Sequence, residues 1–434
     1  MFKGQNCLAL AGAAVLTMTS TITAPAAFAQ SDAAAGDGLA LEEVVVTARK
    51  RAESLEDVPI SITAFSAEAI EERGIESVYD LAKLTPNLSF NQSQGRNFDR
   101  PVIRGQSYVL DRGVSFVVDG VYIAGNIQGA DLDDLEAVEV LKGPQAANYG
   151  RGSLAGVISY RTRKPTKEWT GKLSGSGGQD GYVEANGFIS GPVFGDKLTF
   201  KLGARYYDFD GQYTGISSDG STPRFGAEHS ERVSGALRWE PTENVDLTLR
   251  AYSSQNADGL YTWYVNPTLN CFTGTAVGPT RGGSFCGVQP EIPLDGAIQV
   301  DYADIARQGD PGPTSDTVLI SSEGNWNLGP VTLTGVVSWN RQDEDWIFDD
   351  YLIGTSATNR SQAISPTMTV VNPGGVQRLI QIREYQSQEL RLSSNGEGKF
   401  SWMAGLYNYS QDDSVANGSP EYNVALGMRR AKAV

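Results

Sequence analysis

From residue 166 to residue 434 the chain consists largely of short stretches in which apolar and polar residues alternate. Clear examples are KLTFKLGARYYDFD at 197–210, VTLTGVVSWNRQD at 331–343 and KFSWMAGLYNYSQ at 399–411. Because successive side chains of a strand point to opposite faces, this period of two predicts β-strands with one apolar and one polar face. After the N-terminus there is no run of about 20 apolar residues, which a membrane-spanning helix requires. If the chain crosses a membrane, it therefore does so with strands.

Nine segments carry this alternating pattern, and the connections between them are of two kinds. The segments are 169–178, 181–191, 197–209, 230–240, 245–255, 316–328, 331–345, 382–394 and 399–410. Spans of about 9–11 residues with Trp and Tyr near their ends are typical of tilted transmembrane strands. The connections at 194–196, 240–244 and 327–330 are short, whereas those at 256–315 and 346–380 are long. A soluble β-sandwich also alternates, so the membrane interpretation depends on this asymmetry and on the N-terminal region.

The region from 53 to 165 has the pattern of a small α+β domain. The stretch VPISITAFS indicates a strand, and Ser66 is the expected cap of a short helix that Gly74 ends. Ser77 and Asp80 have the spacing of a second helix start. Asp119-Gly120, between SFVV and VYIA, is the strongest short-range hairpin signal in the chain. EAVEVLKGP and GVISYRTRKP indicate two more strands.

The N-terminus has the pattern of an export signal. Lys3 precedes an apolar run from Leu8 to Leu16, and Ala27-Phe28-Ala29 is a small-residue cleavage site. Residues 1–29 are therefore predicted to be a Sec signal peptide that is removed from the mature protein. Cys7 lies within this leader and lacks the small residue expected just before a lipidated cysteine, which argues against a lipoprotein.

Residues 30–52 have the composition of a linker, interrupted by one short β-branched run. This run is Glu43, Val44, Val45, Val46, Thr47 and Ala48. Two interpretations remain open. The run adds a strand to the sheet edge of a partner, where main-chain hydrogen bonds give the affinity, or it adds an edge strand to its own domain.

Several features argue against other classes of function. The formal net charge of −16 argues against nucleic-acid binding. The single histidine, His229, excludes a zinc motif with two histidines, and its place favours a residue at the start of a strand. Gly150, Gly152 and Ala155 match a dinucleotide pattern, but the β-type run that follows them offers no helix N-terminus to a pyrophosphate. We therefore expect no enzyme, no cofactor and no metal.

The two cysteines of the mature chain, Cys271 and Cys286, lie in a Gly- and Thr-rich stretch that has the composition of an exposed loop. In an oxidising compartment this arrangement predicts a disulfide that closes the loop. A metal site is the weaker alternative, because neither a His nor a third Cys lies nearby.

The order of these blocks resembles one protein family. The run from Glu43 to Ala48 resembles the TonB box of TonB-dependent outer-membrane receptors. The stretches LTPNLSF, IRGQ, VVDGVYI and EAVEVLKGPQAANYGRGSLAGVI resemble successive blocks of the plug domain of that family. The resemblance covers residues 42–165 and departs from the family in AANYGRGSLAG, which lacks one of the usual paired glycines.

The resemblance implies an α+β plug domain at 53–165 followed by an antiparallel transmembrane β-barrel from 166, in the outer membrane of a Gram-negative cell. It implies TonB as a periplasmic partner and membrane lipid around the barrel. The ligand would be a bulky scarce nutrient, with an iron–siderophore complex expected first and cobalamin or an oligosaccharide behind it. By position, the plug residues Arg104 and Arg151 and the barrel residue Glu389 resemble members of a buried charge cluster. The alternative for each is an ordinary strand-end or surface charge.

The strand count sets a limit on this interpretation. Plugged transporters use about 22 strands, and the pattern supplies only about nine or ten. The chain ends in NVALGMRRAKAV, which is basic and lacks the aromatic end expected of a last barrel strand. We therefore expect an incomplete receptor, and the alternative function is a non-transporting fragment that at most binds TonB through its plug. The aromatic residues Tyr108, Tyr122 and Trp263 are candidate ligand contacts, although core or lipid-interface roles account for each of them better.

Overall fold

The computed structural model describes residues 45–47, 50–51, 53–75, 77–91, 96, 100–106, 113–123, 134–149, 152–216, 224–259, 298–299, 312–349, 376–395, 400–418 and 425–432. The chain divides into two units, Met1–Glu43 and Val44–Val434. The first unit, with the predicted signal peptide, lies outside the described residues.

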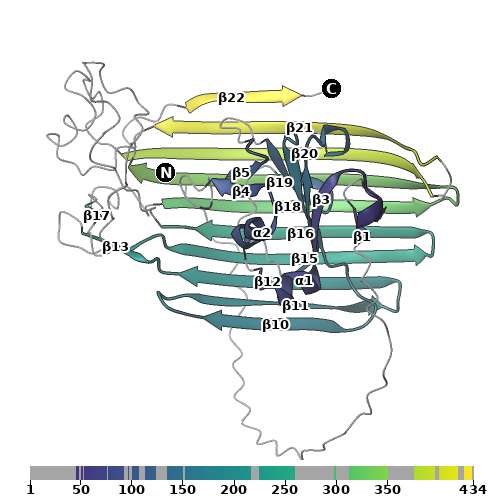
Figure 1. The fold of residues 1–434 in the computed structure, drawn as a ribbon, viewed down its shortest axis with the longest axis horizontal. Helices are drawn as coiled ribbons and strands as arrows, with labels where there is room; N and C mark the ends of the chain where they lie inside the picture. The colour runs from purple at the N-terminus through teal and green to yellow at the C-terminus, as the bar shows by residue number, and fades with distance from the viewer. Residues whose placement is uncertain are drawn as a thin grey trace, which may run out of the picture. The chain divides into compact units, whose positions relative to one another are not determined.

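Elements between residues 45 and 162 form what we call the N-terminal domain (Figure 1). Its main sheet has the order β3-β8-β9-β6-β7, in which β6 and β9 are parallel and the other pairs antiparallel. These strands are β3 (Ser61–Ser66), β6 (Val114–Val118), β7 (Val121–Ile123), β8 (Leu135–Lys142) and β9 (Gly156–Thr162). The smaller elements are β1 (Val45–Val46), β2 (Glu53–Ser54), η1 (Leu55–Asp57), β4 (Leu88–Asn91), β5 (Arg100–Ile103) and α3 (Ala146–Tyr149).

Both predicted helix starts are present. Helix α1 (Ala67–Glu72) begins after Ser66, whose hydroxyl accepts the N–H of Ala69, and α2 (Val78–Leu84) begins after Ser77, which caps its first turn in the same way. A cap of this kind satisfies an N–H that has no partner within the helix.

The predicted hairpin is also present, between β6 and β7. Asp119 and Gly120 both have positive φ, 48° and 82°, as a two-residue turn that follows the twist of its strands requires. The strand β9 follows Ala155 directly, as predicted. A strand at this position offers no helix N-terminus to a pyrophosphate.

The rest of the described chain is dominated by a ten-stranded antiparallel sheet, in which sequence neighbours lie side by side (Figure 1). Its order is β10-β11-β12-β15-β16-β18-β19-β20-β21-β22. The strands are β10 (Thr170–Gly177), β11 (Val183–Phe194), β12 (Leu198–Phe209), β15 (Glu228–Thr242), β16 (Val245–Ala257), β18 (Gly312–Asn327), β19 (Val331–Asp349), β20 (Val376–Ser394), β21 (Met403–Gly418) and β22 (Ala425–Lys432).

Each of the nine predicted segments overlaps one of these strands, and the expected order of an α+β domain before an antiparallel sheet is confirmed. Some strands were not predicted. The basic tail, which lacks the aromatic end expected of a last barrel strand, forms β22 through backbone pairing with β21. A small sheet of β14 (Arg224–Phe225), β13 (Tyr213–Ile216) and β17 (Ile298–Gln299) occupies segments outside the nine predicted strands.

The ten-stranded sheet has the reverse of the alternation found in soluble proteins. On β12, Thr199 and Lys201 are buried, whereas Leu202 is 56 % exposed. Other apolar residues on the exposed face are Leu173, Val233, Leu237, Leu249, Ile320, Val337, Leu390 and Leu406. A wide exposed apolar face marks contact with a membrane or a partner, and polar-inside, apolar-outside alternation is typical of a membrane barrel wall.

None of the helices in the described residues is long and apolar enough to cross a membrane.

Candidate functional site

Three sets of buried or half-buried polar contacts join the N-terminal domain to the inward face of the ten-stranded sheet, besides the more exposed ion pair of Glu71 with Lys172. We call them the box contact, the Arg96 cluster and the central contact, and their residues are given below. Apolar packing contributes as well, because Leu319 of β18 and Val336 of β19 belong to the same buried cluster as Phe116 of the domain. The charged groups in these contacts are the candidates for function.

The box contact begins with a ladder of two residue pairs. Val45 pairs with Ser54 and Val46 with Glu53, so β1 and β2 form a two-stranded sheet of their own. The predicted pairing segment is therefore folded within its own chain, which is the second of the two interpretations left open by the sequence. A two-stranded hairpin is at best marginally stable in water, so this ladder depends on its surroundings.

Glu139 of β8 holds the end of this segment. Its Oε1 accepts the backbone N–H of Thr47 at 2.7 Å and the hydroxyl of the same residue at 3.1 Å. The side chain of Glu139 is only 1 % exposed, and Arg161 Nη1 lies 3.4 Å from Oε1. Burial raises the pKa of the Glu139 carboxyl above its ordinary value, while the bonds from Thr47 and the charge of Arg161 oppose that rise.

Lys50 and Arg51 extend the box contact to the sheet. Lys50 Nζ lies 2.5 Å from Oε2 of Glu389 on β20, and Glu389 also accepts a hydrogen bond from Arg391 at 2.7 Å. Burial lowers the pKa of Lys50, and the negative charge of Glu389 opposes that shift. Arg51 donates to the hydroxyl of Ser394 at 3.3 Å and to the carbonyl of Trp402.

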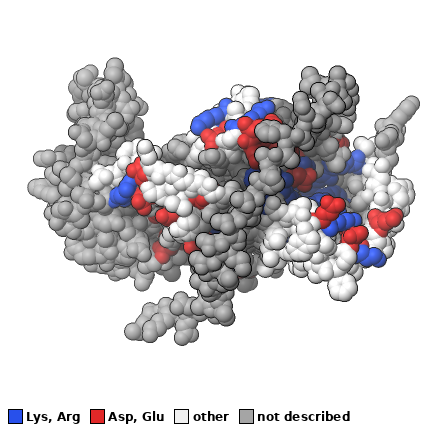
Figure 2. Space-filling view, turned by 90° about the horizontal axis from the view of Figure 1, so that it is seen from below, with Lys and Arg blue, Asp and Glu red and all other residues white. Residues whose placement is uncertain are grey.

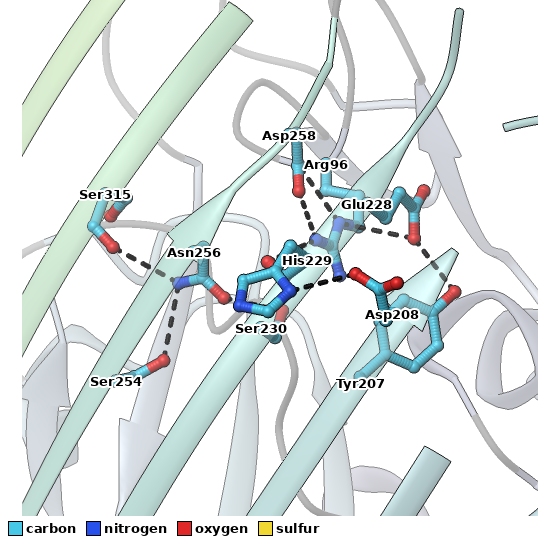
Figure 3. A network of polar contacts seen from close by, with 10 residues as sticks. All are labelled: Arg96, Tyr207, Asp208, Glu228, His229, Ser230, Ser254, Asn256, Asp258 and Ser315. Carbon is cyan, nitrogen blue, oxygen red and sulfur yellow. Dashed lines mark hydrogen bonds and ion pairs between the residues drawn. The ribbon is translucent and has the colours of Figure 1, made fainter. Parts of the chain in front are cut away.

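The Arg96 cluster lies where β12, β15 and β16 meet the long connections (Figure 3). Arg96 donates from two nitrogens to Asp258, which is fully buried, and its Nε lies 3.4 Å from Glu228 Oε2. The hydroxyl of Tyr207 donates to the same oxygen of Glu228 at 3.1 Å. A forked arginine–carboxylate contact fixes orientation as well as charge. Arg96 therefore ties the segment between β4 and β5 to β15 and to the residue that follows β16.

His229 is the second residue of β15, as the sequence predicted. Its Nδ1 lies 3.0 Å from Oδ1 of Asp208, and Figure 3 shows this pair beside the Arg96 cluster. Within the described part of the chain, no group of three or more His, Cys, Asp or Glu side chains is arranged to hold a metal ion.

The central contact joins Asp119 of the β6–β7 turn and Asp134 to the sheet. Arg250 Nε lies 3.2 Å from Asp119 Oδ2, and Lys201 Nζ pairs with Asp134. Burial raises the pKa of Asp134, and the positive charge of Lys201 opposes the rise. Figure 2 shows Lys and Arg side chains gathered in a recess of the surface, with Asp and Glu side chains along its edge.

Only part of the predicted site can be followed in the structure. Glu389 is half-buried in the box contact, whereas Arg104 is exposed, in a turn where its φ is 53°. Outside the described residues lie Glu43, Val44, Ala48, Arg151, Cys271 and Cys286. The meeting of Arg104, Arg151 and Glu389, and the disulfide, therefore stay predictions.

Tyr122 is the one aromatic candidate within the described ranges, because Tyr108 and Trp263 fall outside them. Its ring packs edge-on against Tyr385 of β20 and Tyr409 of β21, with centroids 6.4 and 6.3 Å away. It therefore packs between the domain and the sheet.

Sequence reasoning missed Lys50, Arg96, Asp134, Lys201 and Asp258. For Lys201 a signal was present: it alternates with Leu202 in a strand whose apolar residues face outward, so its own position had to face inward. For Arg96 and Asp258 no local signal exists, because their contact spans 162 residues of sequence.

Comparisons with known proteins give one consistent result. The family model described as the TonB-dependent Receptor Plug Domain matches residues 54–157. The vitamin B12 transporter BtuB of Vibrio vulnificus is 31 % identical over 215 residues, which are 46 % of this chain and 35 % of that protein. The ferrichrome outer membrane transporter/phage receptor of Escherichia coli K12 is 26 % identical over 264 residues, 58 % of this chain and 33 % of that one. The chain thus aligns with about a third of the length of these relatives.

Two solved structures share the fold at low identity. The ferric yersiniabactin uptake receptor FyuA from Yersinia pestis has a TM-score of 0.61 and 18 % identity, over 84 % of this chain and 50 % of that one. The siderophore receptor PiuA from Acinetobacter baumannii has a TM-score of 0.62 and 16 % identity, over 86 % of this chain and 48 % of that one. The described domain and sheet correspond to about half of each of these proteins.

Proposed function

Since the chain belongs to the TonB-dependent outer-membrane receptor family, whose members are not enzymes, we propose that it serves TonB-dependent, energy-coupled uptake of a bulky scarce nutrient across the outer membrane. The observation that carries this proposal is the box contact. A segment with the pattern of a TonB box is held by a ladder of two residue pairs and then tied directly to the sheet through Lys50 and Arg51.

The weakness of this ladder is what suits the segment to its proposed partner. A short strand held by two residue pairs can exchange its neighbour for the edge of a TonB strand, because both pairings use the same backbone groups. Tension on the released segment would then act first on Lys50 and Arg51. Their partners Glu389 and Ser394 are on β20, and Trp402 immediately precedes β21. The force would therefore act on the contact between the N-terminal domain and the ten-stranded sheet.

A ferric siderophore is the first candidate for the ligand and cobalamin the second. The ferrichrome transporter and the ferric yersiniabactin receptor support the former, and the vitamin B12 transporter supports the latter. The proposal includes the predicted division into leader (1–29), linker with TonB box (30–52), plug (53–165) and barrel segment (166–434). It also includes the paired cysteines Cys271 and Cys286.

The proposal is tested by replacing Val45 with proline. Proline has no backbone N–H and removes a donor from the strand, whereas Val45→Thr keeps the donor and the β-branched shape and is the matched control. Cells that carry each variant are given a radiolabelled ferric siderophore and, separately, radiolabelled cyanocobalamin. We expect Val45→Pro to abolish energy-dependent uptake and to retain surface binding of the probe that the wild type takes up. Loss of binding in step with uptake would contradict the proposal.

A further inference from the structure

The outward, apolar face of the ten-stranded sheet contains a hollow with two unlike sides. The hollow has a volume of about 360 Å³ and is formed by β16, β18, β19 and β20. Leu249, Ile320 and Val337 line one side, and all three are exposed. Gln386 and Gln388 of β20, which are exposed as well, line the other. Contact with a membrane accounts for the apolar side, whereas the two carboxamides on this face need a different explanation.

Gln388 has hydrogen-bonding groups that the described residues do not use. It pairs in register with Asn408 of β21, whose Nδ2 donates to Oε1 of Gln388 at 2.6 Å. No other hydrogen bond joins either amide to the described residues, so both N–H donors of Gln388 are left over. Polar groups on a face that meets hydrocarbon cost free energy unless a partner satisfies them. The leftover groups are donors, so the matching partner is an acceptor.

The two glutamines lie where the outward face changes from apolar to charged. Because side chains alternate along a strand, Gln388, Gln386 and Glu384 all point outward. The cross-strand partner of Glu384 is Arg341, so charge begins at this level. Trp339 lines the hollow and donates its indole N–H to Glu384 at 2.8 Å. A tryptophan with its polar tip towards charged groups is typical of the boundary between hydrocarbon and headgroups.

We propose that the hollow binds one membrane lipid by the ester or amide carbonyl through which an acyl chain is attached. The N–H groups of Gln386 and Gln388 would donate to this carbonyl, and the chain would lie against the apolar side. Two observations select a lipid. The leftover groups of Gln388 are donors, which match a carbonyl oxygen, and the glutamines lie between charged and apolar residues, as the carbonyl of a lipid lies between headgroup and chain. The inference goes beyond the proposed uptake and needs only that the sheet stands in a membrane.

The test compares two lipids that differ only in the carbonyl. The full chain, purified in detergent, is titrated with dioleoylphosphatidylethanolamine and with its diether analogue, which has the same headgroup and chains but no carbonyl. Native mass spectrometry measures the fraction of protein that carries one lipid. We expect the ester lipid to bind about threefold to tenfold more tightly than the diether, because each hydrogen bond to the carbonyl contributes about 0.5–1.5 kcal/mol.

Substitutions on the exposed face locate the effect. Gln386→Leu and Gln388→Leu together remove the donors and should bind both lipids with equal affinity. Gln255→Leu, at an exposed glutamine of β16 that does not line the hollow, is the matched control and should keep the wild-type preference.

Two results would overturn the proposal. One is equal binding of the two lipids by the wild type, a comparison that needs no variant to fold. The other is an ester preference that survives the loss of both glutamines. Light scattering on the same samples distinguishes another occupant, since a dimer that dissociates on Gln388→Leu without any ester preference would assign the hollow to a second copy of the chain and not to a lipid.

Discussion

Glu139 combines two opposing effects in one side chain. It is 1 % exposed, which disfavours its charge, and it receives two hydrogen bonds from Thr47, which favour the charge. Because burial raises the pKa of Glu139, the folded chain binds a proton more tightly than the unfolded chain does. The contribution of this group to stability therefore falls as the pH rises from the ordinary carboxyl value through the raised value.

Replacing Glu139 with glutamine should remove this pH dependence. Glutamine keeps an oxygen that can accept from Thr47 but carries no charge. We expect Glu139→Gln to unfold at a higher temperature than the wild type at neutral pH, with the advantage shrinking as the pH is lowered towards about 4.5. Thermal melts across this range measure it. Glu72→Gln, at an exposed acid on α1, is the control, and a difference from the wild type that stays constant with pH would refute the assignment.

At the scale of elements, the start of β18 is the position most restricted by backbone geometry. Gly312 has a φ of 121°, and a Cβ added there would lie 2.0 Å from the carbonyl oxygen of Asp258. The N–H of Asp258 donates to the carbonyl of Pro313 at 2.9 Å, which closes the end of the β16–β18 ladder. Only glycine fits this position, and the Asp258 that it accommodates is the partner of Arg96.

We expect Gly312→Ala to destabilise the chain. Backbone strain alone costs about 1–3 kcal/mol, and the clash of the added methyl with the carbonyl of Asp258 adds to it. The matched control is Gly335→Ala in β19, where an added Cβ meets nothing within 4 Å; its effect should stay within about 0.5 kcal/mol. Denaturant unfolding in detergent compares the two. Equal effects would mean that the conformation at Gly312 does not constrain the ladder.

At the scale of the whole molecule, the ten-stranded sheet presents two different faces. Its outward face is apolar, whereas its inward face meets the N-terminal domain through ion pairs that involve Lys50, Arg96, Asp119 and Asp134. Ionic contacts of this kind give less net stability than an apolar core of similar size, yet removing one partner leaves a buried charge behind. Such a junction has a defined geometry and can still be separated, as the proposed function requires.

A double-mutant cycle on Arg96 and Asp258 tests this view. Arg96→Ala alone should destabilise the chain by about 3–5 kcal/mol, because Asp258 is fully buried and would lose its counter-charge. Adding Asp258→Asn should recover part of the loss, giving a coupling energy of about 0.5–3 kcal/mol from denaturant unfolding. The exposed pair Arg341 and Asp343 is the control, with an expected coupling of about 0–1 kcal/mol. Additive effects at Arg96 and Asp258 would show that the pair does not hold the domain.

The sequence by itself determined the local features of this protein. The caps at Ser66 and Ser77, the Asp119-Gly120 turn and the alternating strands all follow from interactions between residues a few positions apart. Their order then sufficed to place an α+β domain before an antiparallel sheet. It did not suffice for β22, whose pattern carries no alternation and whose pairing comes from its neighbour β21.

Only the tertiary structure decided which charges meet. Lys50 and Glu389 are 339 residues apart, and Arg96 and Asp258 are 162 apart. Whether such groups meet depends on the register of every strand between them and on how the domain sits against the inward face. The family resemblance singled out Glu389 as a possible partner of Arg104 and Arg151, but it did not identify Lys50 as a partner of Glu389. The reason is physical: a backbone pattern fixes the face to which a side chain points, whereas a pair of charges is fixed only when two distant surfaces dock.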